Sequence, residues 1–361
     1  MGKSATVLMS SIALPTSKIG SWTTRMSRFL NECPDVFNYI LSPNSTLKTS
    51  VFCKKRSFFT WKKQLRKVQL LNWVAKDYIK QLKKIGHNHE KLVIVVMDDP
   101  YLLEAISLVK KNLNAEIELI FSFHGFNLLL DSKLMVSIDR ILWLSQSGVD
   151  KNKTKYHEFP KSFVVGNAVD SNVFYPLEDS EYIQNRAAKG YAKTDEILIW
   201  MANDRPKKGF HIFKSVVDNV LKSNKNLKVI IIGSSQTINH PNVNCVGRIA
   251  NHEVATYLQL GNYYMFTTLY EEGFGLSMIE ALKCGNIIIA SNLGAIPEVL
   301  KGIKQTYLID KPEDINSWVQ CFNLARTNSN FGKEKLTKTQ TDCIWNYEDW
   351  EQRFVDAITL I

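Results

Sequence analysis

Short runs of β-branched and other apolar residues alternate along the chain with segments in which apolar residues recur every three or four positions. This alternation predicts strands joined by helices, and therefore parallel sheets. Runs without a polar residue, such as 93–96 and 229–232, indicate strands buried on both faces. The predicted strands form two sets: 6–9, 92–97, 117–121, 140–144 and 162–165, then 197–201, 228–232, 264–267 and 287–290.

A polar, turn-rich stretch from residue 166 to about 194 separates the two sets of strands. We therefore expect an α/β protein with two domains, residues 1–166 and residues 167–344. The length of 361 residues agrees, because it exceeds the usual size of a single domain. Residues 345–361 have an amphipathic pattern, with Trp350, Phe354 and Ile358 on one face, and are predicted to form a helix.

The formal net charge of +10 is concentrated in one segment. Residues 53–84 hold eleven Lys and Arg against the single acid Asp77, which accounts for the whole excess. From residue 65 to 84 the apolar positions share one side of a helical wheel and the basic ones the other, with Trp73 among the basic residues. A cationic face with a tryptophan suits an anionic membrane surface. A solvated helix face is the alternative, and nucleic acid is disfavoured because no base-reading module accompanies the segment.

The apolar runs and the cysteines of the sequence bear on where in the cell the protein is located. No apolar run reaches the roughly 18 to 20 residues that a membrane span requires, and the six cysteines form neither a Cys-x-x-Cys pair nor a zinc-ligand pattern. We expect a cytoplasmic chain that is peripheral on the inner face of the membrane, with reduced thiols.

Residues 271–280, Glu-Glu-Gly-Phe-Gly-Leu-Ser-Met-Ile-Glu, carry the most informative motif. The motif follows a predicted strand and precedes a predicted helix, which is where open α/β sheets bind ligands. Gly273 and Gly275 let the backbone approach a ligand, and the amides at the helix start form an anion site. Glu272 and Glu280 can accept hydrogen bonds from hydroxyls. Phosphate-binding amides between two such carboxylates suit a sugar joined to a ribose through phosphates.

This stretch resembles the Glu-x7-Glu signature of retaining GT-B glycosyltransferases, most closely glycosyltransferase family four. Other segments are similar to those of the family: 19–20, 123–125, 165–170, 199–209, 285 and 294–298. The resemblance implies the GT-B fold, two Rossmann-like domains with parallel sheets facing across a cleft. It also implies that the first domain binds the acceptor, that the second binds the nucleotide sugar, and that the last helix returns to the first domain. Transfer is implied to be metal-independent, with stereochemistry retained.

The resemblance also implies roles for individual residues. Lys208 neutralises the donor diphosphate, Glu280 holds the ribose hydroxyls and Glu272 holds the transferred sugar. His124 lies near the reacting face of that sugar, and His124 and Glu272 are the catalytic candidates. The donor-binding residues implied are Gly20, Asn203, Arg205, Lys208, Arg248, Ile249, Glu272, Gly273, Phe274, Gly275, Leu276, Ser277 and Glu280. The co-substrate is a UDP- or GDP-linked sugar, the acceptor is a glycan or lipid-linked glycan of cell-surface polysaccharide or glycoconjugate synthesis, and no cofactor is required.

Two positions depart from the family pattern. Asn203 stands where the family usually has an arginine, five residues before Lys208, and Arg205 is the candidate to replace it. Gly20 is a single glycine where many relatives have two. These departures leave a second hypothesis open, a non-catalytic GT-B module that binds a nucleotide sugar or a membrane.

Two further alternatives concern single sites. Asp98 and Asp99 follow a predicted strand and resemble the metal-binding pair of the other glycosyltransferase fold, but Pro100 after them favours a helix cap at Asp99. His124 follows an apolar strand and is also consistent with a core histidine.

Overall fold

The computed structural model describes residues 4–16, 21–56, 67–328 and 336–359. It divides into two compact units: unit 1 contains residues 1–166 and 351–361, and unit 2 contains residues 167–350. The division after Gly166 falls at the predicted boundary. The predicted Gly20 and the Lys and Arg residues between 57 and 66 lie outside the described residues.

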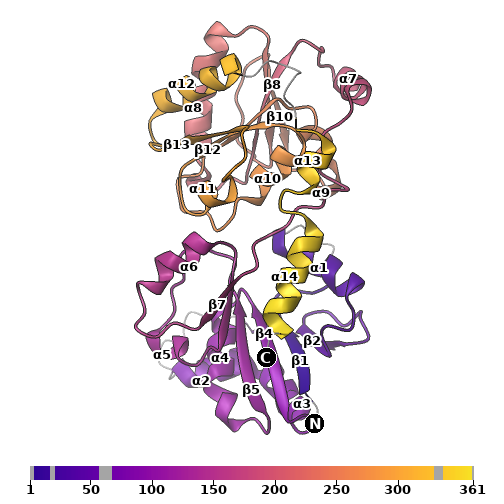
Figure 1. The fold of residues 1–361 in the computed structure, drawn as a ribbon, viewed down its shortest axis with the longest axis vertical. Coiled ribbons are helices and arrows are strands. Elements are labelled where there is room, and N and C mark those ends of the chain that lie inside the picture. Colours follow the sequence, from indigo (N-terminus) through magenta and orange to yellow (C-terminus); the bar gives the residue numbers. More distant parts are fainter. Residues whose placement is uncertain (1–3, 17–20, 57–66, 329–335, 360–361) are drawn as a thin grey trace. The chain divides into compact units, whose positions relative to one another are not determined.

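Unit 1 is built on a seven-stranded parallel sheet of order β3-β2-β1-β4-β5-β6-β7 (Figure 1). The central strands β1, β4 and β5 are nearly devoid of exposed side chains, because helices cover parallel sheets on both faces. Strands β2 and β3 were not predicted, since both are short and the edge strand β3 is partly exposed. The strands are β1 Ser4–Met9, β2 Tyr39–Ser42, β3 Ser50–Phe52, β4 Lys91–Met97, β5 Glu116–Ser122, β6 Arg140–Trp143 and β7 Lys161–Val164.

The helices of unit 1 connect these strands in chain order. They are α1 Ser21–Glu32, α2 Lys67–Val74, α3 Lys76–Gly86, α4 Pro100–Val109, the short 3-10 helix η1 Lys110–Asn112, α5 Ser132–Met135 and α6 Gln146–Lys153.

The basic segment forms two helices rather than the single helix predicted from residue 65 to 84. The break is at Ala75, whose φ of −98° and ψ of 13° leave helical geometry. The predicted apolar face is nevertheless buried at Leu71, Ala75 and Leu82. The guanidinium of Arg56 lies 5.6 Å from the ring centroid of Trp73, so a cation of the same segment covers part of this indole.

Unit 2 is built on a six-stranded parallel sheet of order β10-β9-β8-β11-β12-β13 (Figure 1). Its strands are β8 Glu196–Met201, β9 Leu227–Ile232, β10 Val243–Gly247, β11 Tyr263–Phe266, β12 Ile287–Ser291 and β13 Thr306–Ile309. Its helices are α7 Asp179–Ala188, η2 Pro206–Lys208, α8 Phe210–Ser223, α9 Asn251–Leu258, α10 Leu276–Lys283, α11 Ile296–Val299, α12 Ile315–Asn328 and α13 Lys338–Asp342.

The last helix, α14 (Tyr347–Thr359), crosses from unit 2 to unit 1 at Glu351. The sequence placed this return at Trp345, which is too early. Trp345 belongs to unit 2, because its indole donates a hydrogen bond to the Val299 carbonyl (3.0 Å) and its ring packs on Phe274. Among the described residues, no helix is long and apolar enough to cross a membrane.

Candidate functional site

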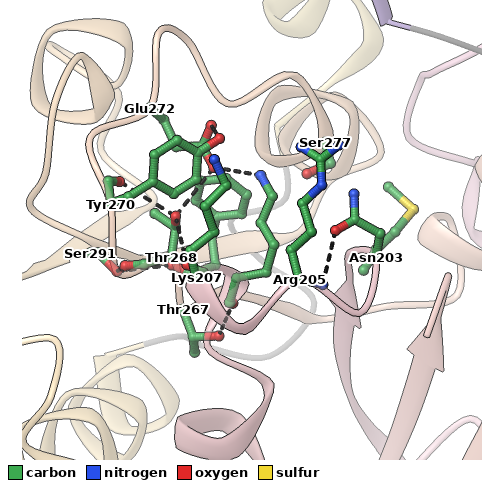
Figure 2. A network of polar contacts seen from close by, with 12 residues as sticks. Asn203, Arg205, Lys207, Thr267, Thr268, Tyr270, Glu272, Ser277 and Ser291 are labelled. Atoms are coloured by element: carbon green, nitrogen blue, oxygen red, sulfur yellow. Dashed lines mark hydrogen bonds and ion pairs between the residues drawn. The ribbon is translucent and has the colours of Figure 1, made fainter. Parts of the chain in front are cut away.

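The candidate site lies at the carboxyl edge of the unit 2 sheet, between β8 and β11. From β8 the sheet continues through β9 to β10, and from β11 it continues in the other direction through β12 to β13. The loops after β8 and β11 therefore leave the sheet where the strand order reverses. Ligands of open α/β sheets bind at such points. Most residues predicted to bind a donor lie on these two loops (Figure 2).

Gly209 allows the two loops to approach closely. Its φ is +73°, and a Cβ atom there would lie 1.9 Å from the carbonyl oxygen of Thr267. The hydroxyl of Thr267 lies 3.0 Å from the carbonyl oxygens of both Lys208 and Gly209, and it accepts a hydrogen bond from the Trp200 indole at 2.9 Å. The backbone from which the Lys208 side chain extends is thereby held against the end of β11.

Lys208 and Glu272 form the central ion pair of the site. The Nζ atom of Lys208 lies 2.6 Å from Oε1 of Glu272, and the two side chains are only 17% and 10% exposed. The Thr268 hydroxyl lies 3.2 Å from the same oxygen, and the Tyr270 hydroxyl donates to Oε2 at 2.8 Å (Figure 2). Both oxygens of the Glu272 carboxylate are therefore engaged, and the side chain is fixed in orientation.

Tyr270 links this carboxylate to a second cation. The Nζ atom of Lys207 lies 3.7 Å from the Tyr270 ring centroid, and that of Lys208 lies 5.2 Å from it. Burial, together with the neighbouring Glu272, raises the pKa of Tyr270, so the phenol stays protonated and remains a donor. The sequence analysis missed Tyr270, Lys207 and Thr268 as members of the site; their place within the two motif loops was the only available signal.

A glycine outside the motif holds the backbone of Glu272. Gly294 has a φ of +62°, and a Cβ atom there would lie 2.6 Å from the carbonyl oxygen of Glu272. The amide of Ala295 donates to that carbonyl at 2.9 Å. The segment 294–298, predicted from resemblance alone, thus supports the loop that carries the ion pair.

The glycines of the motif shape the entry to α10. Gly275 precedes the helix with a φ of +87°, and Gly273 and Phe274 are buried, the latter with its ring centroid 4.9 Å from that of Trp345. The first turn, beginning at Leu276, has amides without partners inside the helix. These amides and the helix dipole make the start of α10 an anion site.

Glu280 lies one turn further along α10. Burial raises the pKa of its carboxyl from 4.5 to about 7. No hydrogen bond to this carboxylate comes from any residue that the structure describes. Nearby, the Tyr264 hydroxyl lies 3.0 Å from the Ser277 hydroxyl oxygen, which ties the first turn of α10 to β11. A desolvated carboxylate without a donor is suited to hold ligand hydroxyls.

The remaining predicted donor-binding residues lie at the rim of the same edge. Asn203 is exposed, and its Oδ1 accepts from the amide of Arg205 at 3.2 Å. The Arg205 side chain is also exposed, extends to the same side of the loop as Lys207 (Figure 2), and is near enough to lower the pKa of Tyr270. Arg248, which is followed by the half-buried Ile249, is 79% exposed and lies 4.0 Å from a carboxylate oxygen of Asp204.

His124 follows β5 in unit 1. Its amide donates to Oδ1 of Asp98 (3.0 Å), its Nε2 lies 3.1 Å from the Ser122 hydroxyl, and its ring centroid lies 5.2 Å from that of Trp22. Burial and the nearby Arg25 hold the pKa of His124 well below its usual value, so the ring is neutral at physiological pH. Its Nδ1 is buried and has no hydrogen-bond partner among the described residues.

Asp99 is a helix cap, as its position before Pro100 indicated. Its carboxylate accepts from the amides of Tyr101 and Leu102 at 3.1 Å and pairs with Lys55 at 2.5 Å. Within the described part of the chain, no group of three or more His, Cys, Asp and Glu is arranged to hold a metal ion.

Residues 182–339 match the family Glycosyl transferases group 1. The match lies within unit 2. It contains both loops of the site, the ion pair between them and Glu280. The matched residues therefore include the donor-binding positions predicted after β8 and β11.

Two relatives illustrate the similarity of the sequence. The chain is 25% identical over 249 residues to the GPI3 subunit of phosphatidylinositol N-acetylglucosaminyltransferase from Saccharomyces cerevisiae, covering 63% of this chain and 53% of the relative. It is 30% identical over 97 residues to phosphatidyl-myo-inositol mannosyltransferase from Propionibacterium freudenreichii, covering 27% and 26%. The chain thus spans about half of the yeast relative.

The fold extends the similarity beyond the residues that match the family. The structure of Anabaena HepE in complex with UDP and glucose matches with a TM-score of 0.70 and 14% identity, covering 99% of this chain and 100% of that one. Together with the two parallel sheets of seven and six strands, this likeness shows a GT-B fold, and the predicted fold class is confirmed.

Proposed function

We propose that this protein transfers a sugar from a nucleoside-diphosphate sugar to an acceptor hydroxyl, with retention of stereochemistry and without a metal ion. The observation that carries the proposal is the Lys208–Glu272 pair, largely buried beside the start of α10 at the switch point of the sheet. A cation and unpaired helix amides on one side, with carboxylates on the other, match a molecule that carries both phosphates and hydroxyls.

In this proposal Lys208 exchanges partners when the donor binds. Its ammonium leaves Glu272 for the diphosphate, and the first amides of α10 share the phosphate charge. Glu272, released from the ion pair but still bonded by Tyr270, accepts hydrogen bonds from the transferred sugar. Glu280 accepts hydrogen bonds from the ribose, which supplies the donors that its carboxylate lacks.

The transfer forms one bond and breaks another. The acceptor oxygen bonds to the anomeric carbon, and the bond from that carbon to the phosphate oxygen breaks with its electron pair leaving on the nucleoside diphosphate. The acceptor proton passes to the departing phosphate. Lys208 and the α10 amides stabilise the charge that develops on the leaving group, the effect that such donors usually contribute most strongly.

Arg205 replaces the arginine that is missing at Asn203. The Asn203 amide side chain bonds to the Arg205 backbone and leaves the guanidinium extended from the loop. Arg205 is near enough to lower the pKa of Tyr270, so its charge reaches the region of the Lys208–Glu272 pair.

The acceptor proposed is a hydroxyl of a lipid-linked glycan or an inositol lipid. Two observations support it: the names of both relatives refer to phosphatidylinositol, and residues 53–84 carry the whole excess of positive charge. Lys76, Lys80 and Lys84 are exposed on α3 and are the described cations best placed to meet an anionic membrane surface. The donor proposed is a UDP- or GDP-linked sugar.

The proposal is tested by a thermal-shift screen against UDP, GDP, ADP and their sugars without metal, followed by donor hydrolysis. We expect stabilisation by one nucleotide that is lost in Glu280→Ala and Lys208→Ala, together with slow hydrolysis of its sugar. Stabilisation without any hydrolysis or transfer would favour the non-catalytic module. No stabilisation by any nucleotide would contradict a donor site.

A further inference from the structure

A second group of side chains gathers at the carboxyl edge of the unit 1 sheet. That sheet also reverses its strand order, between β1 and β4, and Asp98 follows β4 directly. His124 follows the neighbouring strand β5, and Trp22 lies near the start of α1, which follows β1. The edge where ligands of open sheets bind thus carries a carboxylate, an imidazole and an indole in unit 1 as well.

Asp98 occupies a backbone conformation that few residues other than glycine adopt. Its φ is +43°, in the left-handed region, because the chain must turn from β4 to the extended cap residue Asp99 before Pro100. Glycine adopts this conformation freely, and aspartate and asparagine adopt it more often than most other residues. The turn itself therefore does not require the charge of an aspartate.

The charged form of the Asp98 carboxylate is unfavourable in the folded protein. Burial raises its pKa from 3.8 to about 6, and the charge of Asp99 adds to the increase. No ion pair to Asp98 comes from a described residue, whereas the neighbouring Asp99 pairs with Lys55 at 2.5 Å. The hydrogen bond that Asp98 accepts from the His124 amide requires only a neutral oxygen, which asparagine also has.

The groups around Asp98 form a surface suited to a polyol ring. Asp98 is only partly buried. The neutral His124 ring has a buried Nδ1 without a partner among the described residues. The half-exposed Trp22 ring lies 5.2 Å from it, centroid to centroid. A carboxylate accepts hydrogen bonds from hydroxyls, while an indole covers the C–H face of a saturated ring.

We propose that Asp98, with His124 and Trp22, binds the hydroxyl-bearing ring of the acceptor, a sugar or an inositol. Asp98 is a positioning residue that accepts a hydrogen bond from a ring hydroxyl. The assignment of this ring to the acceptor rests on the proposed transferase activity. The binding of a polyol ring at this edge does not, because it can be measured without a donor.

The test compares Asp98→Asn with the wild type. Asparagine keeps the left-handed turn and the bond from the His124 amide, so the variant is expected to fold. We expect the dissociation constants of myo-inositol and methyl α-mannopyranoside, measured by saturation-transfer difference NMR in the presence of UDP and of GDP, to rise at least 10-fold for one of the two rings. Asp99→Asn is the matched control and should leave ring binding unchanged, because it alters the neighbouring carboxylate.

Hydrolysis of the donor by water shows whether Asp98 contacts the ring of the acceptor or the sugar of the donor. Hydrolysis that is equal in Asp98→Asn and in the wild type places the ring on the acceptor side. A parallel loss of hydrolysis would mean that Asp98 contacts the donor sugar, and would overturn the assignment. Ring binding that is absent in the wild type, or equal in Asp98→Asn, would overturn the site itself. The ring-binding results stand whether or not nucleotide binds unit 2, whereas the hydrolysis result requires the donor to bind.

Discussion

At the scale of one residue, the buried carboxyl of Glu280 lowers the stability of the folded protein at neutral and higher pH. Its pKa of about 7 in the folded protein lies above the ordinary value of 4.5, so the folded protein holds this proton more tightly. Stability from this group is therefore present below pH 4.5 and is lost as pH rises to about 7. We expect Glu280→Gln to raise the free energy of unfolding at pH 8 by about 1 to 3 kcal/mol, allowing for partial exposure, and to leave it unchanged at pH 4.5.

The same substitution should weaken nucleotide stabilisation. Urea unfolding at the two pH values, with and without the nucleotide, measures both effects. A variant that is less stable than the wild type at pH 8 would show that the carboxylate supports the fold rather than a ligand.

Lys208 and Lys207 are adjacent and carry the same charge, which makes them a matched pair. Lys208 contacts the Glu272 carboxylate directly, whereas Lys207 is exposed and lies over the Tyr270 ring. We expect Lys208→Ala to lower kcat for donor hydrolysis by about 10² to 10³, the usual effect of losing one strong electrostatic contact to a leaving group. Lys207→Ala should lower it less than tenfold. Equal losses would contradict a specific role for Lys208.

The role of Arg205 is tested by removing its positive charge and then placing an arginine at position 203. Arg205→Ala is expected to lower kcat by about 10- to 100-fold, since an exposed guanidinium is more screened than Lys208. Asn203→Arg in that background places a cation at the position that the family pattern favours, and should restore part of the rate. Steady-state kinetics with the preferred donor measures both. No loss in Arg205→Ala would leave the missing arginine without a replacement.

At the scale of elements, Gly209 shows how closely the loops after β8 and β11 approach. Gly209→Ala combines a strained φ with a contact of 1.9 Å to the Thr267 carbonyl, so the backbone must shift. We expect a loss of about 2 to 4 kcal/mol in the free energy of unfolding. Gly190→Ala is the control, because Gly190 has a φ of +81° but nothing within 4 Å of the added Cβ. It should cost about 1 kcal/mol. Equal losses in denaturant unfolding would show that strain alone matters.

The elements that could be predicted from the sequence are those with strong local patterns. The central strands of both sheets are long apolar runs, and the glycines of the 271–280 motif mark the start of α10. Strand β2 and the edge strands β3, β10 and β13 were not predicted, because their short sequences become strands only by pairing with a neighbour. The break at Ala75 was not predicted either, because the helical pattern of apolar residues continues through it.

Site residues could be predicted from the sequence where they belong to a recognisable motif, and not elsewhere. Lys208, Glu272 and Glu280 belong to recognisable segments, and the structure brings the first two into contact. The partners of Glu272, Thr268 and Tyr270, are ordinary residues of a loop. Their function depends on where the side chains point, which periodicity does not encode. Asp98 was interpreted only as part of an acidic pair, because its positive φ is a property of the folded backbone.

At the scale of the whole molecule, unit 1 is assembled from both ends of the chain, residues 1–166 and 351–361. Phe354 of α14 is buried in unit 1, with its ring centroid 5.3 Å from that of Phe29 and 6.5 Å from that of Phe37. In the same helix, the Ala357 carbonyl accepts a hydrogen bond from Arg140 at 2.8 Å. The core of unit 1 is therefore incomplete without residues 351–361.

Phe354→Ala is expected to destabilise unit 1 by about 3 to 5 kcal/mol, the usual cost of removing a buried aromatic ring. Hydrogen exchange measured by mass spectrometry reports the two units separately. Protection should fall in the unit 1 strands and stay unchanged in β8 and β11, and UDP or GDP should stabilise the variant as it does the wild type. Asp356→Ala, at an exposed position of the same helix, is the control. An equal loss of protection in unit 2 would mean that the two units unfold together.

The place of Phe354 in the chain also has a consequence for biosynthesis. Domains of a nascent chain usually fold in the order in which they are made. Here the rings of Phe29 and Phe37 are translated first, yet the ring that covers them is added more than 300 residues later. During that interval an apolar surface of the first half stays open on the ribosome. We expect this half to depend on chaperones until residue 354 has left the exit tunnel, whereas the second half needs only its own residues to close its core.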